Sequence, residues 1–328
     1  MNKRKVFGIL VVVMIAVFAT AAVIIAASSA TNKTALFSRH QPGGLFALVN
    51  ESDGVGNIWF VDSGSATGAD AAGYGRNPDA PYLTIDYAIG NCTASNGDRI
   101  FVAPGHAENV STAAYIDADA AGVRIIGQGV GRNRPVLTWT AAVGEIKVNA
   151  ADVSFENLVF NMELTGGVFG GTTLYSTATD TVFKDCDFVI PSVDTVMVLT
   201  GGTRTQINNC RFYGSTGSGT GVTTAVIAIG SGVYNVEIKD TSIIAYNTTQ
   251  DTALIAASTS RVSGFTLQDS SIIQGNSGAS CWNFSTVGLV SEGLIKNVAT
   301  TVGNEGTGGT SSYQLHTILR LPPYNANE

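Results

Sequence analysis

Charged residues and the residue types of common catalytic and metal sites are scarce in this chain. Asp, Glu, Lys and Arg make up 13% of the 328 residues, and the formal net charge is −7 at pH 7. No basic stripe is present, which argues against a nucleic acid as partner. The 3 histidines show no paired spacing, and Cys92 and Cys281 show no metal-ligand spacing. With 38 glycines, the composition suits a β-solenoid and argues against a disordered chain.

A six-residue pattern recurs through the second half of the chain. Each copy reads apolar, any, Asn or Asp, any, any, and then apolar or Thr. Successive copies begin 28, 24, 31, 29 and 28 residues apart. Such self-similarity predicts stacked repeats, none of which can bury its apolar face alone. The copies begin at Phe155, Phe183, Ile207, Ile238, Leu267 and Ile295.

Each repeat contains the signals of three short strands. Apolar and polar residues alternate on both sides of the Asn or Asp, which predicts two strands with a bend between them. A third strand is expected upstream in each repeat, followed by a Ser/Thr/Gly turn. Three strands and three turns in about 28 residues form one coil of a parallel β-helix. The third strands are expected at Leu174–Ser176, Val196–Thr200, Ala225–Gly230, Leu254–Ala257 and Trp282–Phe284.

Stacking the coils predicts three inward columns of side chains. The first column contains the six residues that begin the copies. The second contains Leu158, Cys186, Cys210, Thr241, Ser270 and Val298. The third contains Phe160, Phe188, Phe212, Ile243, Ile272 and Thr300. Because Thr and Ser replace Cys and Phe in the later coils, the core is expected to thin toward the C-terminus.

The two ends of the solenoid also have sequence signals. Val123–Gly127 matches the pattern at Val153–Asn157 at a spacing of 30, and Asp98–Gly105 reads as the first complete strand and turn. Residues 81–89 predict a short amphipathic helix that covers the open N-terminal end. Thr84 or Asp86 lies in its first turn, and its apolar face is expected to contain Leu83, Tyr87 and Ala88.

Four segments follow from these patterns. Residues 1–30 are a signal peptide or membrane anchor, 31–56 a linker, 57–304 the parallel β-helix, and 305–328 a C-terminal tail or a cover for the open end. Within the last segment, Tyr313–Leu321 alternates weakly and could add a final strand, which Pro322 and Pro323 would end.

A set of positions, most of them before the repeats, carries a resemblance to a known superfamily. The positions are Asn77–Pro81, Thr84, Ile85, Ala88, Ile89, Gly97, Asp98, Val102–Glu108 and Ala121–Gly127. They resemble the opening segment of the right-handed parallel β-helix, or pectin-lyase-like, superfamily, and are most similar to β-helix proteins of tailed phages and their metagenomic relatives. The resemblance covers residues 57 to 304 and implies an all-β right-handed parallel β-helix of about eight or nine coils. It implies little about function, because this fold carries lyases, hydrolases, tailspikes, adhesins and inert stalks.

Residues 6–27 are uncharged and follow Lys3, Arg4 and Lys5. A secretory signal peptide would be cut near Ser28–Ala30, whereas 22 apolar residues also suit an uncleaved membrane anchor. Either interpretation places the β-helix outside the cytoplasm, secreted or anchored. Phage structural proteins usually lack such a leader, so this segment departs from the resemblance.

Four charged residues near the bend are the candidates for chemistry on polysaccharides. Glycoside hydrolysis needs paired carboxylates, and a lyase needs a base together with a cation such as calcium. The alternative is a solvated face of alternating charge, which we favour, because the residue series of polygalacturonases and pectate lyases are not found. If the chain is not such an enzyme, no cofactor is expected. The four residues are Glu156, Lys184, Asp187 and Arg211.

Two further pairs are expected to stack on successive coils. Cys186 and Cys210 could form a disulfide, but adjacent parallel strands fit disulfide geometry poorly, so two buried thiols are favoured. Asp240 and Asp269 would bring like charges together at the bend, which a bound cation would relieve. Two carboxylates that point outward and cap the bend are the simpler interpretation.

His106 follows a Pro-Gly turn and lies near Glu108. It could act as a general base, but a histidine that bonds its own loop is favoured.

The sequence therefore leaves two functional hypotheses. The first is a non-catalytic extracellular or virion-type structural module that presents a Ser/Thr/Asn-rich face to extracellular polysaccharide or cell-surface glycan, with a homotrimer as one possible assembly. The second is a polysaccharide lyase or glycoside hydrolase acting through the charged patch. A flat face favours the first hypothesis, and a carboxylate-lined groove with calcium favours the second.

Overall fold

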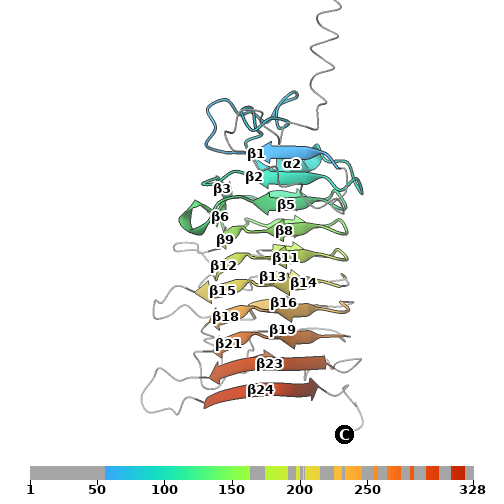
Figure 1. Ribbon diagram of the computed structural model, residues 1–328, viewed down its shortest axis with the longest axis vertical. Helices are drawn as coiled ribbons and strands as arrows, with labels where there is room; N and C mark the ends of the chain where they lie inside the picture. The colour runs from blue at the N-terminus through green and yellow to red at the C-terminus, as the bar shows by residue number, and fades with distance from the viewer. Residues whose placement is uncertain are drawn as a thin grey trace, which may run out of the picture. The chain divides into compact units, whose positions relative to one another are not determined.

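The computed structural model shows an all-β parallel solenoid (Figure 1). It describes residues 56–162, 174–190, 197–199, 202, 204–214, 225–230, 233–245, 255–257, 264–274, 281–283, 293–302 and 312–321. The leader expected at 1–30 and nearly all of the linker expected at 31–56 lie outside these residues. None of the helices in the described ranges combines the length and apolar character that a membrane span requires.

The first strands of the coils stack in one parallel column, as the stacked arrows of Figure 1 show. Their register follows the repeat, since Phe155 pairs with Phe183 and Phe183 with Ile207. The column contains β1 (Ile58–Val61), β2 (Arg99–Val102), β5 (Arg124–Gly127), β8 (Ser154–Glu156), β11 (Val182–Lys184), β14 (Gln206–Asn208), β17 (Glu237–Lys239), β20 (Thr266–Gln268) and β23 (Gly293–Val302).

The second strands form another parallel column after the bend. It contains β3 (Ala107–Val110), β6 (Val136–Trp139), β9 (Val159–Asn161), β12 (Asp187–Ile190), β15 (Arg211–Gly214), β18 (Ser242–Ala245) and β21 (Ser271–Gln274), and it ends on β23. A single-turn 3-10 helix, η2 (Gly131–Asn133), precedes β6. The predicted two-strand unit with a bend is therefore confirmed.

The third strands form a separate seven-stranded sheet. It contains β4 (Ile116–Ala118), β7 (Ile146–Val148), β10 (Leu174–Ser176), β13 (Met197–Leu199), β16 (Ile227–Ile229), β19 (Ile255–Ala257) and β22 (Trp282–Asn283). All five predicted third strands are present in this sheet: β10 has the predicted bounds, and the ends of the other four differ by at most two residues.

The number of coils differs from the prediction. Within the described residues, seven coils contain all three strands, from β2–β4 to β20–β22. The end turns are built differently: β1 is followed by a helix, and β23 fills both the first and the second strand position. The segment predicted to contain the first strand, Asp98–Gly105, contains β2. It is the second strand of the column, because β1 precedes β2 and pairs with it in parallel.

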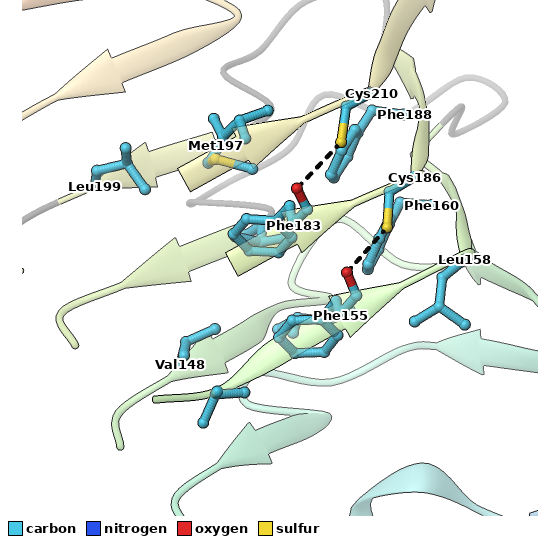
Figure 2. Packing of buried hydrophobic residues seen from close by; sticks show 14 of the residues in the cluster. Val148, Phe155, Leu158, Phe160, Phe183, Cys186, Phe188, Met197, Leu199 and Cys210 are labelled. Atoms are coloured by element: carbon cyan, nitrogen blue, oxygen red, sulfur yellow. Dashed lines mark hydrogen bonds between the residues drawn. The ribbon is translucent and has the colours of Figure 1, made fainter. Parts of the chain in front are cut away.

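The inward columns are buried as predicted, and rings stack along two of them (Figure 2). Phe155 and Phe183 stack at 5.4 Å between ring centroids, with their planes 7° apart. In the neighbouring column, Phe188 stacks on Phe160 at 4.8 Å and on Phe212 at 4.4 Å. One-coil spacing thus holds aromatic rings in the offset-stacked arrangement that they prefer.

Every bend residue of the recurring pattern has a left-handed backbone. The φ angles of Asn157, Asp185, Asn209, Asp240, Asp269 and Asn297 lie between 49° and 56°. Asn and Asp tolerate this region better than other residues with a side chain, which explains why the pattern requires them. Side chains also bond along the stack: the Asn209 amide donates to the Asp185 carboxylate at 2.6 Å.

A second left-handed position precedes the first strand of each of several coils and was not found in the sequence. Its residues differ in type: Gly122, Asp152, Asp180, Arg204, Asn235 and Gly264. At Gly264, where φ is 71°, a Cβ atom would lie 2.1 Å from Asn235 Oδ1. This close approach explains the glycine at that position.

The predicted N-terminal helix is present as α2 (Ile85–Gly90), with Thr84 as its N-cap. The Thr84 hydroxyl accepts a hydrogen bond from the Tyr87 N–H, as an N-cap does. The buried face differs from the prediction because the helix begins later than expected. It contains Ile85, Ala88 and Ile89.

At the other end, β24 (Ser312–Leu321) pairs antiparallel with β23. The final strand predicted at Tyr313–Leu321 is therefore present. It runs antiparallel to β23, whereas the other strands of the column pair in parallel.

Candidate functional site

Three charged residues meet on the outer side of the second-strand column. Asp187, at the start of β12, accepts hydrogen bonds from Arg134 Nη1 at 2.8 Å and from Arg211 Nε at 2.8 Å. A second Arg211 nitrogen, Nη2, also donates to the Asp187 carboxylate, so that pair is bidentate. Both carboxylate oxygens of Asp187 are therefore engaged by arginines.

Arg134 links this cluster to neighbouring coils. Its Nη2 atom donates to the carbonyl oxygens of Leu158 and Asp185, while Nη1 reaches Asp187. Arg134 itself precedes β6, so one side chain connects three successive coils. The Nε atom of Arg134 is buried and has no hydrogen-bond partner among the residues that the structure describes. The guanidinium is thus largely removed from water and depends on Asp187 for its counter-charge.

The position of Asp187 limits what it can do chemically. Only 6% of the residue is exposed, whereas 64% of the Arg211 side chain is exposed. The hydrogen bonds and charge of Asp187 raise the pKa of Arg211 above its ordinary value. A general base must offer a free oxygen to a substrate proton. Asp187 would have to release an arginine before it could do so.

Glu156 belongs to a different ion pair. Its Oε1 atom accepts hydrogen bonds from Arg124 Nε at 3.0 Å and Nη2 at 2.8 Å, and from the Ser154 hydroxyl at 3.2 Å. Lys184 lies beside Glu156 in the strand register and is exposed. The structure thus assigns the four predicted residues to two groups, one on each side of the bend.

The exposed neighbours of Arg211 on β15 include an aromatic residue. Tyr213 lies two positions after Arg211 and so points to the same outward face. The Arg211 Cζ atom is 5.9 Å from the centre of the Tyr213 ring, and 36% of Tyr213 is exposed. Strand pairing places Val189 on one side of Tyr213 and Ile244 on the other.

Cys186 and Cys210 are free, buried thiols. Each donates to the backbone: Cys186 Sγ to the Phe155 carbonyl at 3.4 Å, and Cys210 Sγ to the Phe183 carbonyl at 3.5 Å (Figure 2). Burial, and then the neighbouring Cys186 thiol, raise the pKa of Cys210 well above its ordinary value. A thiol in this environment is a poor nucleophile, and the structure has the favoured arrangement of two separate thiols.

Asp240 and Asp269 are exposed and occupy the same bend position on neighbouring coils. Asp269 already accepts hydrogen bonds from Asn297 at 2.8 Å and from Gln268 at 2.6 Å, which lower its pKa. Across the described ranges, no three His, Cys, Asp or Glu residues are grouped so that they could hold a metal ion.

His106 is fully buried and has both ring nitrogens engaged. Its Nδ1 atom accepts a hydrogen bond from the Ser63 backbone N–H at 3.0 Å, and its Nε2 atom lies 3.0 Å from Glu108 Oε2. The Ser63 hydroxyl accepts from the Ala107 N–H instead of contacting the imidazole. These contacts give His106 a structural role, in which it joins the Ser63 backbone to Glu108, and they agree with the interpretation of a histidine that bonds local structure.

Sequence reasoning missed two of the three arginines that hold the predicted carboxylates, Arg124 and Arg134. Arg124 lies on the outer face of β5, and period-two alternation could have placed it one coil before Glu156. Arg134 lies between η2 and β6 in a stretch that does not follow the repeat. No periodic signal points from it to Asp187, 53 residues later.

Comparison with protein-family models, curated proteins and solved structures finds no significant match.

Proposed function

We propose that this chain is a non-catalytic structural or surface module, placed outside the cytoplasm or on a virion, that presents an outward β-solenoid face to glycans. The proposal rests on one observation. Each carboxylate of the predicted patch is held by arginine, Glu156 by Arg124 and Asp187 by Arg134 and Arg211. Both carboxylates are therefore neutralised by arginine, and Asp187 has both of its oxygens engaged.

The architecture supports a scaffold role in a second way. Coils that stack in register form a continuous row of pairings from β1 to β23. In such a solenoid each coil contacts its neighbours, and the outward positions form long, regular faces. Those faces suit recognition of a repeating ligand, and the pectin-lyase-like or phage-type resemblance of the sequence agrees with this use.

The test is an assay for reducing ends, which both glycoside hydrolases and lyases create. The full-length chain, kept in solution with a mild non-ionic detergent, is incubated with calcium and with uronate-containing and neutral polysaccharides. We expect no release above background, together with co-sedimentation of the protein with at least one insoluble polysaccharide. Release that disappears in Asp187→Asn or Glu156→Gln, with the circular dichroism spectrum unchanged, would replace the proposal with the enzyme hypothesis.

A further inference from the structure

The two ends of the stack differ in how the edge of their outermost strand is paired. At the β1 end a loop covers that edge: the Phe60 N–H donates to the Gly75 carbonyl at 2.8 Å, and the Phe60 carbonyl accepts from the Tyr82 N–H at 2.9 Å. At the other end, β24 pairs with β23 along one edge (Figure 1), and no strand in the described ranges pairs with its other edge. This open edge is 10 residues long. An open edge of this length is a template for strand addition.

Hydrogen bonds of β23 determine which backbone groups of β24 point to the open edge. The Leu294 N–H donates to the Phe265 carbonyl of the preceding coil, so the backbone groups of Leu294 point away from β24. Its partner Arg320 is therefore in a non-hydrogen-bonded pair, and the N–H and carbonyl of Arg320 point to the open edge. Ala299 likewise donates to the preceding coil, which gives its partner Leu315 the same orientation. By this relation, the residues with backbone groups at the open edge are Tyr313, Leu315, Ile318 and Arg320.

These four residues are placed symmetrically about a bend. The register between β23 and β24 has no pair at Asn297, the left-handed bend residue of β23, and the alternation restarts there. A two-fold axis through this bend, in the plane of the coil, sets β24 of a second copy antiparallel to the first, with Ser312 opposite Leu321. The axis keeps the inner side of each coil over the inner side of the other, so the core continues across the contact. Outward backbone groups then lie opposite outward groups, Tyr313 opposite Arg320 and Leu315 opposite Ile318.

We propose that two copies of this chain associate through the open edges of β24 in an antiparallel, two-fold symmetric dimer, so that one solenoid continues into the other. Such a contact uses the same surface on both copies and closes after two of them. Each hydrogen-bonded antiparallel pair exchanges two bonds, so the four outward residues of each copy form about eight backbone hydrogen bonds. A typical protein interface contains about ten.

A second copy is also the occupant that suits the end of the core. At the β1 end the buried face of α2 joins the core, whereas no helix of the described ranges lies at the β24 end. The first inward column reaches its last register position at Leu319, which pairs with Ile295. The residues directly after β24 are poor candidates for a further strand, because Pro322 and Pro323 lack the N–H that a ladder needs. The dimer does not depend on what the outward face binds.

The first test measures the mass of the full-length chain by sedimentation in a mild non-ionic detergent, over a range of protein concentrations. We expect a dimer. Leu315→Pro removes an N–H from the open edge and none from the ladder with β23, so the fold should be kept while the dimer dissociation constant rises at least about tenfold. Leu315→Ala is the matched control, because it truncates the same side chain and keeps the N–H. The urea unfolding midpoint checks that both variants are folded.

The second test identifies the register and needs no proline. In the dimer, Ser312 of one copy lies opposite Leu321 of the other in a non-hydrogen-bonded pair, whose Cα atoms are about 4.5 Å apart. That separation fits a disulfide. The double variant Ser312→Cys/Leu321→Cys should therefore form a covalent dimer under mild oxidation, visible on a non-reducing gel. Ser312→Cys alone should not, because the new thiol then lies opposite a leucine.

Each outcome decides the inference. A dimer that Leu315→Pro weakens and Leu315→Ala keeps, together with a crosslink specific to the double variant, supports it. A monomer at every concentration, a trimer, or a dimer that Leu315→Pro leaves intact overturns it. If Leu315→Pro does not fold, the crosslink decides alone, and its absence from the double variant overturns the inference.

Discussion

The middle coils and the last coils place different side chains at the same inward positions. In the phenylalanine coils, β8 to β15, the position after the bend holds Leu158 and then the thiols of Cys186 and Cys210. In the aliphatic coils, β17 to β21, it holds the hydroxyls of Thr241 and Ser270. All four polar atoms bond the carbonyl oxygen two residues earlier, at 3.2, 3.3, 2.8 and 2.7 Å respectively.

This comparison shows how the expected thinning of the core is distributed among the inward columns. Thr241 Oγ1 also lies 3.3 Å from the Ile207 carbonyl of the previous coil, the same relation that Cys210 has to Phe183. From Cys186 to Ser270 the position therefore holds a small side chain that donates to the backbone at the bend, whereas Leu158 and Val298 occupy it in the coils on either side. Serine and threonine fill it with shorter hydrogen bonds than cysteine, and the loss of apolar volume falls mainly on the ring columns.

The largest expected effect concerns the stacked phenylalanine rings Phe160, Phe188 and Phe212 of the middle coils. Phe188→Ala removes the middle of three stacked rings and should lower the free energy of unfolding by about 4 kcal/mol. Ile272→Ala, at the equivalent position of an aliphatic coil, should cost about 3 kcal/mol. Equilibrium urea unfolding of the two variants measures the difference. An equal or larger cost for Ile272→Ala would show that ring stacking adds nothing to the middle coils.

The second effect concerns ion pairs, which occur in the middle coils and not among the described strands of the aliphatic coils. Asp187→Asn leaves the Arg134 guanidinium buried without its counter-charge and should cost about 3 kcal/mol. Asp180→Asn is the control, because its pair with Arg204 is exposed to solvent and should contribute little to stability. The described residues of β17, β18, β20 and β21 form no ion pair, so these coils offer no equivalent. Similar unfolding midpoints for the two variants would contradict a role for Asp187 as the buried link between coils.

A third effect tests the hydrogen bonds after the bend. Thr241→Val keeps the shape of the side chain and removes its hydroxyl, which bonds the Lys239 carbonyl at 2.8 Å. The Lys239 carbonyl still accepts from the Asn209 N–H, but the buried Cys210 N–H loses its acceptor, Thr241 Oγ1 at 3.4 Å, and the two lost bonds should cost about 1–2 kcal/mol. Cys210→Thr, which moves the hydroxyl into a phenylalanine coil, should change stability by less than about 1 kcal/mol. If thermal unfolding shows Thr241→Val to be neutral, apolar volume and not hydrogen bonding selects this position.

What could be predicted from the sequence follows from how local each signal is. Period-two alternation and the Asn or Asp at each bend lie within six residues, so strands, bends and inward columns could be predicted. The second left-handed position could not, because residues as different as Asp152, Arg204 and Gly264 occupy it. The contact between Arg134 and Asp187 depends on the path of the segment around η2, which lies outside the repeat.

The candidate site shows the same division. The outward direction of Asp187 and Arg211, and their adjacency on neighbouring coils, follow from the strand register, and the structure has both. Glu156 and Asp187 were expected in one patch, since only three residues separate their positions in a coil. The bend between the two strands gives each carboxylate its own arginine instead.

The smallest expected effect is on the acid stability of the aliphatic coils. Hydrogen bonds from Asn297 and Gln268 lower the pKa of Asp269. A carboxyl with a lowered folded-state pKa contributes stability above its ordinary pKa, about 3.9, and loses it as the pH falls through the lower value. Asp269→Asn should therefore flatten the decline of the unfolding temperature below about pH 4. Because Asp269 is exposed, the change should be small.

A double-mutant cycle makes this last comparison specific. Asn297→Ala removes the amide that donates to Asp269, so it should weaken the acid-dependent stability in the wild-type background. In the Asp269→Asn background the same substitution should leave the pH profile unchanged, because the ionisable partner is absent. If Asn297→Ala shifts both profiles equally, the contribution of the Asn297 side chain to the stability of the last coils does not depend on the charge of Asp269.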